Sequence, residues 1–194
     1  MLQSEKTAPI VNNSSEVAQS KRENTSDFTT FNVYVSTWKR YNELGGLSGH
    51  WVDLLDFDTV GDFFDYLNET FPDERGQHEY CFLDYEGFLP FDENYIITDE
   101  FLELIKKLSN HRDPKKIIEY ADIRGIELTI DTIEEAESAF CCEAKNDYDL
   151  GYYFAHELEC LKIPDNLMCY FDYKKYGREV RHDLIESENY CFFY

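Results

Sequence analysis

The sequence has few basic side chains and no long apolar run. Its 194 residues include 18 Lys and Arg against 40 Asp and Glu, which gives a formal charge of −22. The amino terminus, MLQSEKTAPIVNN, lacks the apolar core and the cleavage site of a signal peptide. No stretch approaches the roughly 18–20 apolar residues that a membrane span needs. We therefore expect a protein of the reducing cytoplasm that has no membrane partner and does not bind nucleic acid directly.

Motifs of catalytic and metal sites are also missing. The six Cys form no CxxC pair, and no GxSxG, phosphate-binding loop or Rossmann glycine run is present. His156 and Cys160 are four residues apart, but two ligands make a poor zinc site. A faint calcium-loop pattern from Asp147 has Leu158 where the twelfth position requires Glu. We predict no catalytic residue, no metal and no cofactor, so an enzyme is the least favoured interpretation.

Apolar and aromatic residues, in contrast, are plentiful. They include 15 Tyr and 15 Phe within a hydrophobic fraction of 43%, which excludes wholesale disorder. Residues 1–27 are polar, and their three basic and four acidic side chains leave −21 of the charge to the remaining 167 residues. We predict a flexible extension over 1–27, followed by a folded part that carries the charge.

Periodicity and turn signals predict an α+β protein built from successive small units. The first unit, 28–95, is α+β, with strands over 31–38, 50–55 and 80–85 and a glycine-rich loop over 41–49. It also contains a helix over 59–71, which Asp58 caps and which turns Phe63, Phe64 and Leu67 inward. A break follows over 72–77. The second, 96–144, is helical, with helices over 100–110, 115–124 and from 131 or 132 to about 144. The third, 145–194, is α+β, with helices over 150–161 and 170–184 and a strand over 189–194.

The carboxylates are spread over the whole folded part. Asp62, Asp65 and Glu69 form one row of like charges, since residues three and four apart on a helix lie about 5–6 Å from each other. Duplex DNA carries one negative charge per about 1.7 Å, so two folded parts together match at most roughly 70 Å of duplex. The candidate partner-binding carboxylates are Asp53, Asp56, Asp62, Asp65, Glu69, Asp99, Glu100, Glu103, Glu119, Asp122, Glu134, Glu135, Glu137, Asp147, Asp149 and Glu157. A solvated acidic surface without a dedicated partner stays an open alternative.

Three stretches, in the family's order, resemble the ArdA-type antirestriction proteins. The first runs from Val33 to Asn42 and continues from Gly46 to Leu54, and the second, Phe82 to Phe88, reads FLDYEGF. The third, Tyr170 to Val180, reads YFDYKKYGREV and is similar to the family's antirestriction motif. It departs from the family pattern at Lys174, where an acid is usual, and at Glu179, where Asp is usual.

The resemblance implies an elongated molecule of three small domains that forms a homodimer through the last one, 145–194. It also implies competition with DNA for the groove of type I restriction–modification enzymes, in their methyltransferase core with its specificity subunit. Such proteins are bacterial and cytoplasmic, and are carried by conjugative elements, plasmids or phages. A packing or dimer-interface role is favoured over direct partner contact for the motif residues Tyr170, Phe171, Asp172, Tyr173, Tyr176, Arg178, Glu179 and Val180. The alternative function is an acidic module that binds another basic DNA-binding protein.

Overall fold

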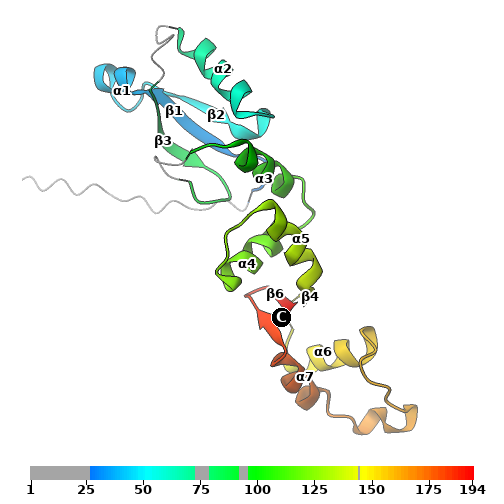
Figure 1. The fold of residues 1–194 in the computed structure, drawn as a ribbon. Helices are drawn as coiled ribbons and strands as arrows, with labels where there is room; N and C mark the ends of the chain where they lie inside the picture. The colour runs from blue at the N-terminus through cyan, green and yellow to red at the C-terminus, as the bar shows by residue number, and fades with distance from the viewer. Residues whose placement is uncertain (1–26, 73–78, 92–95, 144) are drawn as a thin grey trace, which may run out of the picture.

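The chain forms an elongated α+β arrangement, as the sequence predicts. The structure is a computed structural model that describes residues 27–72, 79–91, 96–143 and 145–194. The extension predicted over 1–27 lies outside these residues except for Asp27, as does most of the break predicted over 72–77. Figure 1 shows the elements in a row, with a three-stranded sheet at one end, helices in the middle, and the carboxyl terminus partway along the row.

The first sheet is antiparallel, with strand order β2–β1–β3. Its strands are β1 (Asn32–Thr37), β2 (His50–Asp53) and β3 (Tyr80–Glu86). Helix α2 (Val60–Thr70) packs on this sheet, where its Phe63 ring stacks on Phe82 of β3 with the ring centroids 6.4 Å apart. The three strands predicted for the first unit are confirmed, and the buried Val33, Val35 and Val52 belong to its core.

Two predictions in this unit are wrong at the level of single elements. Residues Trp38–Leu44 form helix α1, where the end of a strand and the start of a loop were expected. Thr37 caps α1 by accepting a hydrogen bond from the Arg40 amide, and glycine begins only at Gly45, so the helix fits before the turn. The predicted second strand also stops early, because Leu54–Asp56 form the 3₁₀ turn η1.

Helix α2 differs from its prediction at its start and on one face. Thr59, not Asp58, is the cap, since its hydroxyl accepts from the Asp62 amide. Phe64 was expected to point inward but is 38% exposed, because it lies beside the buried Phe63 on a helix whose apolar face is narrow.

Helix α3 (Asp99–Ser109) begins after its cap Thr98 and connects the sheet unit to the helical middle. Its predicted inner face is confirmed, because Phe101, Leu104, Ile105 and Leu108 are all buried. Two contacts join α3 to the beginning of α2. The Val60 amide donates to Asp99 at 2.7 Å, and Lys106 pairs with Asp58 at 2.5 Å.

Helices α4 (Pro114–Arg124) and α5 (Ile130–Ala139) complete the middle. The predicted boundaries of α4 are confirmed, since Asp113 caps it and Gly125 ends it with φ of 62°. The helix predicted to reach about Ala144 is wrong beyond Ala139. Residues Phe140–Glu143 form strand β4 instead, because this segment pairs with a strand at the far end of the chain.

The carboxyl-terminal unit has shorter helices than predicted. Helix α6 (Asp147–Tyr152) begins earlier than expected and continues as a π-helical turn, η3, that ends at Glu157 rather than Leu161. The helix predicted over 170–184 is only α7 (Tyr173–Arg181), since Asp172 is its cap. The remaining elements are the 3₁₀ turn η4 (Asp165–Tyr170) and the strands β5 (Leu184–Glu186) and β6 (Tyr190–Phe193).

Strand β6 joins the middle helices to the carboxyl-terminal unit. It lies between β4 and β5 in the second antiparallel sheet, near the C label in Figure 1. Successive side chains of a strand face opposite ways. Tyr190 and Phe192 accordingly belong to the core shared with α4 and α5, whereas Cys191 belongs to the cluster with Leu150 of α6. The pairing of β4 with β6 crosses the predicted boundary at residue 144, and the division into three domains stays a prediction.

Candidate functional site

The candidate site is a set of carboxylates that remain free on the surface. About half of the nominated carboxylates are exposed and have no hydrogen-bond or ion-pair partner within the described ranges 27–72, 79–91, 96–143 and 145–194. They are Asp56, Asp65, Glu69, Glu100, Asp122, Glu134, Glu135 and Glu157. They come from η1, α2, α3, α4, α5 and η3, and so from both ends and the middle of the row in Figure 1.

Two helices carry their acids in rows. On α2, Asp62, Asp65 and Glu69 are exposed while Phe63 and Leu67 are buried, so the charged and apolar faces are separate. On α5, Asp131 is exposed and stands three and four residues before Glu134 and Glu135. Sequence reasoning noted Asp131 only as a possible helix start. Its spacing from Glu134 and Glu135 was the signal that could have found it.

Other nominated carboxylates are fixed by contacts within the protein. Asp53 accepts hydrogen bonds of 3.0 Å from the amides of Phe31 and Leu55, which holds β1 beside η1. Glu119 of α4 accepts bonds of 2.6 and 3.2 Å from Asn189, at the start of β6. Burial raises the pKa of Glu119, but hydrogen bonds from Ser187 and Asn189 lower that pKa by more, so its charge is stabilised.

Asp147 is held by the arginines of α7. It pairs with Arg181 at 3.0 Å and with Arg178 at 3.7 Å. Arg181 also donates to the Lys145 carbonyl at 2.7 Å and pairs with Glu186, and the hydrogen bond to Glu186 raises the pKa of Arg181. Arg181 therefore fixes the start of α6 against α7 and β5. Sequence reasoning did not single it out, since its partners lie in separate segments.

The remaining nominated acids have local or nearby partners. Glu137 pairs with Lys116 at 2.6 Å and with His111 at 3.1 Å. The other pairs are Glu103 with Lys107 at 3.0 Å, Asp62 with the Thr59 hydroxyl at 2.7 Å, Asp149 with the Asn146 amide at 2.6 Å, and Asp99 with Val60 as above. Lysine partners reduce the net charge of the surface at Glu137 and Glu103, whereas the partners of Asp62, Asp99 and Asp149 are uncharged groups.

The segment that resembles the antirestriction motif lies where η4 meets α7. Tyr170 is 81% exposed at the end of η4, and the ring of Phe171 packs against Tyr173 and Tyr176, with centroids 4.9 and 5.6 Å away. Asp172 caps α7 by accepting from the Lys175 amide at 3.0 Å. The Tyr173 hydroxyl lies 2.7 Å from His156 Nε2, which ties α7 to η3.

A pair of glycines lets the motif helix lie against α6. A Cβ at Gly177 would overlap the Asp147 carbonyl oxygen, and one at Gly151 would overlap the Tyr173 carbonyl oxygen. Gly177 lies inside the quoted motif, and a glycine in a helical pattern was a signal of close packing that sequence reasoning did not use.

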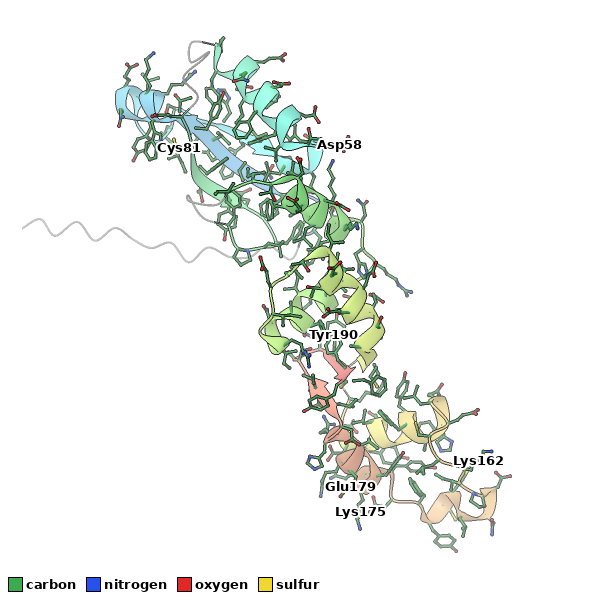
Figure 2. All side chains as sticks on the ribbon, in the orientation of Figure 1. Asp58, Cys81, Lys162, Lys175, Glu179 and Tyr190 are labelled. Carbon is green, nitrogen blue, oxygen red and sulfur yellow. The ribbon has the colours of Figure 1, made fainter. Side chains whose placement is uncertain are left out.

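The last residues of the motif lie on two sides of α7. Val180 packs against the second core cluster, while Arg178 and Glu179 are exposed. Figure 2 labels Glu179 and Lys175 on α7, at the end of the row away from the first sheet, and Tyr190 nearer the middle. Packing thus accounts for Phe171, Tyr173, Tyr176 and Gly177 of the motif, but not for the exposed Tyr170 and Glu179.

An apolar patch includes the first residue of the motif and residues that precede it. It contains Leu161, Leu167, Met168 and Tyr170, with exposed fractions of 38%, 49%, 36% and 81%. Leu161, Leu167 and Tyr170 line a hollow of about 390 Å³ together with Phe171. Apolar side chains gathered in this way mark a surface that another protein can cover.

The described part of the chain contains no group of three or more His, Cys, Asp or Glu side chains that could hold a metal ion. None of the helices in the same ranges is long and apolar enough to cross a membrane.

A comparison with protein families decides which group of proteins this is. The model of the family described as "Antirestriction protein (ArdA)" matches residues 33–191. The chain belongs to the ArdA family. The match includes all three of the stretches that resemble the family, and it gives this ArdA protein an antirestriction function with restriction–modification enzymes as partners. The family is one of inhibitors and not of enzymes. No individual curated protein matches the sequence.

Proposed function

We propose that this ArdA protein inhibits type I restriction–modification enzymes as an acidic mimic of DNA. It would occupy the DNA-binding groove of the methyltransferase core with its specificity subunit, blocking restriction and also modification. One observation carries the proposal: exposed carboxylates that have no partner among the described residues recur on successive elements along an elongated fold, from Asp65 on α2 to Glu157 on η3. DNA presents its phosphates in the same way, as charge repeated along an axis.

The size of the charge supports this mechanism over a general need for solubility. A net charge of magnitude about 2–8 keeps a small domain soluble, whereas the residues after Asp27 carry −21. Repulsion between these charges opposes folding. A groove lined with Lys and Arg would relieve that repulsion on binding, and the counterions released from both surfaces would add to the affinity.

A homodimer would double the length over which charge is presented. The apolar patch at Leu161, Leu167, Met168 and Tyr170 supports an interface in the carboxyl-terminal unit, because such side chains are costly to leave in water. An interface there would leave α2 and α5 exposed, since both belong to the other units of the row. The motif residues beside the patch would then act by shaping the interface.

Competition for DNA tests the proposal directly. A purified type I methyltransferase core is loaded with a fluorescent duplex that contains its recognition site, and the ArdA protein is added while anisotropy is followed. We expect full displacement of the duplex and a matching loss of methyl transfer. A basic DNA-binding protein unrelated to restriction serves as the control. Equal displacement from the control would favour the alternative, a general acidic module, and failure to displace DNA from the methyltransferase would contradict the mechanism.

A further inference from the structure

We propose that the groove between the amino-terminal ends of α3 and α5 is a docking site for one arginine side chain of the target enzyme. The groove has a volume of about 300 Å³. Its rim carries Glu100, Glu127 and Asp131, and its floor contains Phe101, Leu104 and Leu128. The inference rests on the proposed function, because the arginines in question are those that line a groove built for DNA phosphates.

The size of the groove suits a single side chain. Pockets for whole small molecules measure about 300–1,000 Å³, so this one is at the lower limit. Phe101, Leu104 and the half-buried Leu128 line the groove, so its floor is apolar. An arginine can lay its methylene stem on such a floor while its charged head stays at the rim.

The charge of the rim favours a cation. Three exposed carboxylates have no hydrogen-bond or ion-pair partner in the part of the chain that the structure describes: those of Glu100, Glu127 and Asp131. Together they carry about −3, against roughly +0.5 from each of the two helix ends, so the groove keeps a net negative charge. A guanidinium is a better fit than an ammonium, because its planar fork can bond two carboxylates at once.

A second hollow beside α3 provides a contrast. It lies on the other side, between α3 and the start of α2, and two lysines line it together with three carboxylates: Lys106, Lys107, Asp58, Asp99 and Glu103. Two of the three carboxylates there are paired with lysines, with nitrogen–oxygen distances of 2.5 Å for Asp58 and 3.0 Å for Glu103. The third, Asp99, accepts a hydrogen bond from the Val60 amide. Among the described residues, no lysine or arginine lines the groove at Glu100, so its three carboxylates stand beside an apolar floor without a cationic partner.

The rim is held in place before any partner arrives. The Thr132 hydroxyl donates to the Glu127 carbonyl at 2.9 Å, and the Thr129 hydroxyl accepts from the Thr132 amide at 3.3 Å. These bonds fix the segment that carries Glu127 and Asp131 against the first turn of α5. A preformed rim reduces the entropy lost on binding.

The test uses the full chain, labelled with ¹⁵N, and Nα-acetyl-L-arginine amide as the probe. We expect the probe to shift the amide signals of residues 98–101 and 127–131 more than those of α2. The variant E100Q/E127Q/D131N should bind the probe about tenfold more weakly, because it removes charge-assisted hydrogen bonds. The control D65N/E69Q/E157Q removes the same charge elsewhere and should keep the affinity of the wild type.

Equal weakening in both triple variants, or shifts spread evenly over the acidic helices, would overturn the inference. So would stronger binding of Nα-acetyl-L-lysine amide than of the arginine probe. The measurement needs no restriction enzyme, so its failure is separate from that of the proposed function. If the enzyme displacement experiment succeeds while the arginine probe fails, the docking site is wrong and the mimicry stands.

Discussion

The Tyr190 hydroxyl donates a 2.9 Å hydrogen bond to Asp113, which lies 77 residues earlier and caps α4. Tyr190 is the first residue of β6, and the next residue, Cys191, belongs to the carboxyl-terminal core cluster with Leu150. The bond therefore fixes the last strand to the helical middle. Together with the Glu119–Asn189 bonds, it holds in place the joint on which the relative position of the acidic helices depends.

Removing this bond should weaken the joint in a pH-dependent way. Burial, followed by the hydrogen bond to Asp113, raises the pKa of Tyr190 above the ordinary value of about 10. The folded state thus keeps the phenol proton to higher pH than the unfolded state. This stabilisation is complete below about pH 10 and is lost as pH rises through the folded pKa.

We therefore expect Y190F to lower the free energy of unfolding by about 1–2 kcal/mol at pH 8. Its stability should also fall less steeply than that of the wild type above about pH 10. Urea unfolding followed by circular dichroism over this range measures both effects. Parallel pH profiles for the two proteins would show that the Tyr190 proton does not contribute.

At the glycine pair between α6 and α7, we expect alanine to change stability in the direction opposite to that given by helix propensity. Alanine in place of a helical glycine normally stabilises by about 0.5–1 kcal/mol. At Gly177 the added Cβ would overlap the Asp147 carbonyl, so we expect G177A to destabilise by about 1–3 kcal/mol or more.

The control for G177A is G61A on α2, where the nearest atom to the added Cβ is the Thr59 hydroxyl at 3.4 Å. We expect G61A to be neutral or slightly stabilising. Thermal unfolding compares the two variants. A G177A protein as stable as G61A would mean that α6 and α7 do not pack as closely as described.

Free and fixed carboxylates should respond differently to neutralisation. E134Q/E135Q removes two exposed charges on α5 that have no partner in the part of the chain that the structure covers. Stability should therefore stay equal or rise slightly, while displacement of DNA from the enzyme weakens. D147N should instead lower the free energy of unfolding by about 1–3 kcal/mol, since it takes a partner from Arg181. Chemical unfolding and the competition assay, run on both variants, separate the roles. Loss of stability in E134Q/E135Q would count against free carboxylates on α5.

The apolar patch predicts the association state. L167E/Y170E places two charges on the patch, which should dissociate the proposed homodimer at micromolar concentration. Sedimentation velocity measures the change. The control is I96E, at a residue that is 79% exposed outside the patch, and it should remain dimeric. A wild-type monomer, or a dimer that survives L167E/Y170E, would place the interface elsewhere.

Local signals explain which parts of the fold could be predicted. The Asp113–Pro114 start and the Gly125 end of α4 depend on cap chemistry within a few residues, and both are confirmed. The buried face of α3 follows from helical spacing alone. Strand β4 could not be found in this way, because it becomes a strand by pairing with β6, whose residues lie about fifty positions later.

The same limit applies to the candidate site. Charge and spacing identified the acidic row on α2, but they could not separate free carboxylates from fixed ones. Asp53 bonds an amide 22 residues away, and Glu119 bonds a residue 70 positions away. Such partners are brought together only by the folded chain. The cap of α2 is Thr59 and not the predicted Asp58 for a related reason, since Asp58 pairs with Lys106 of α3.

The most direct test of the account is the salt dependence of binding to a type I methyltransferase core. Affinity is measured by isothermal titration calorimetry between about 50 and 200 mM salt, the range over which proteins with several phosphate contacts lose about 10³–10⁵ in affinity. We expect a steep, linear fall of the logarithm of affinity with the logarithm of salt concentration, and a shallower slope for E134Q/E135Q. An affinity that stays constant across this range would contradict recognition through carboxylates in place of phosphates.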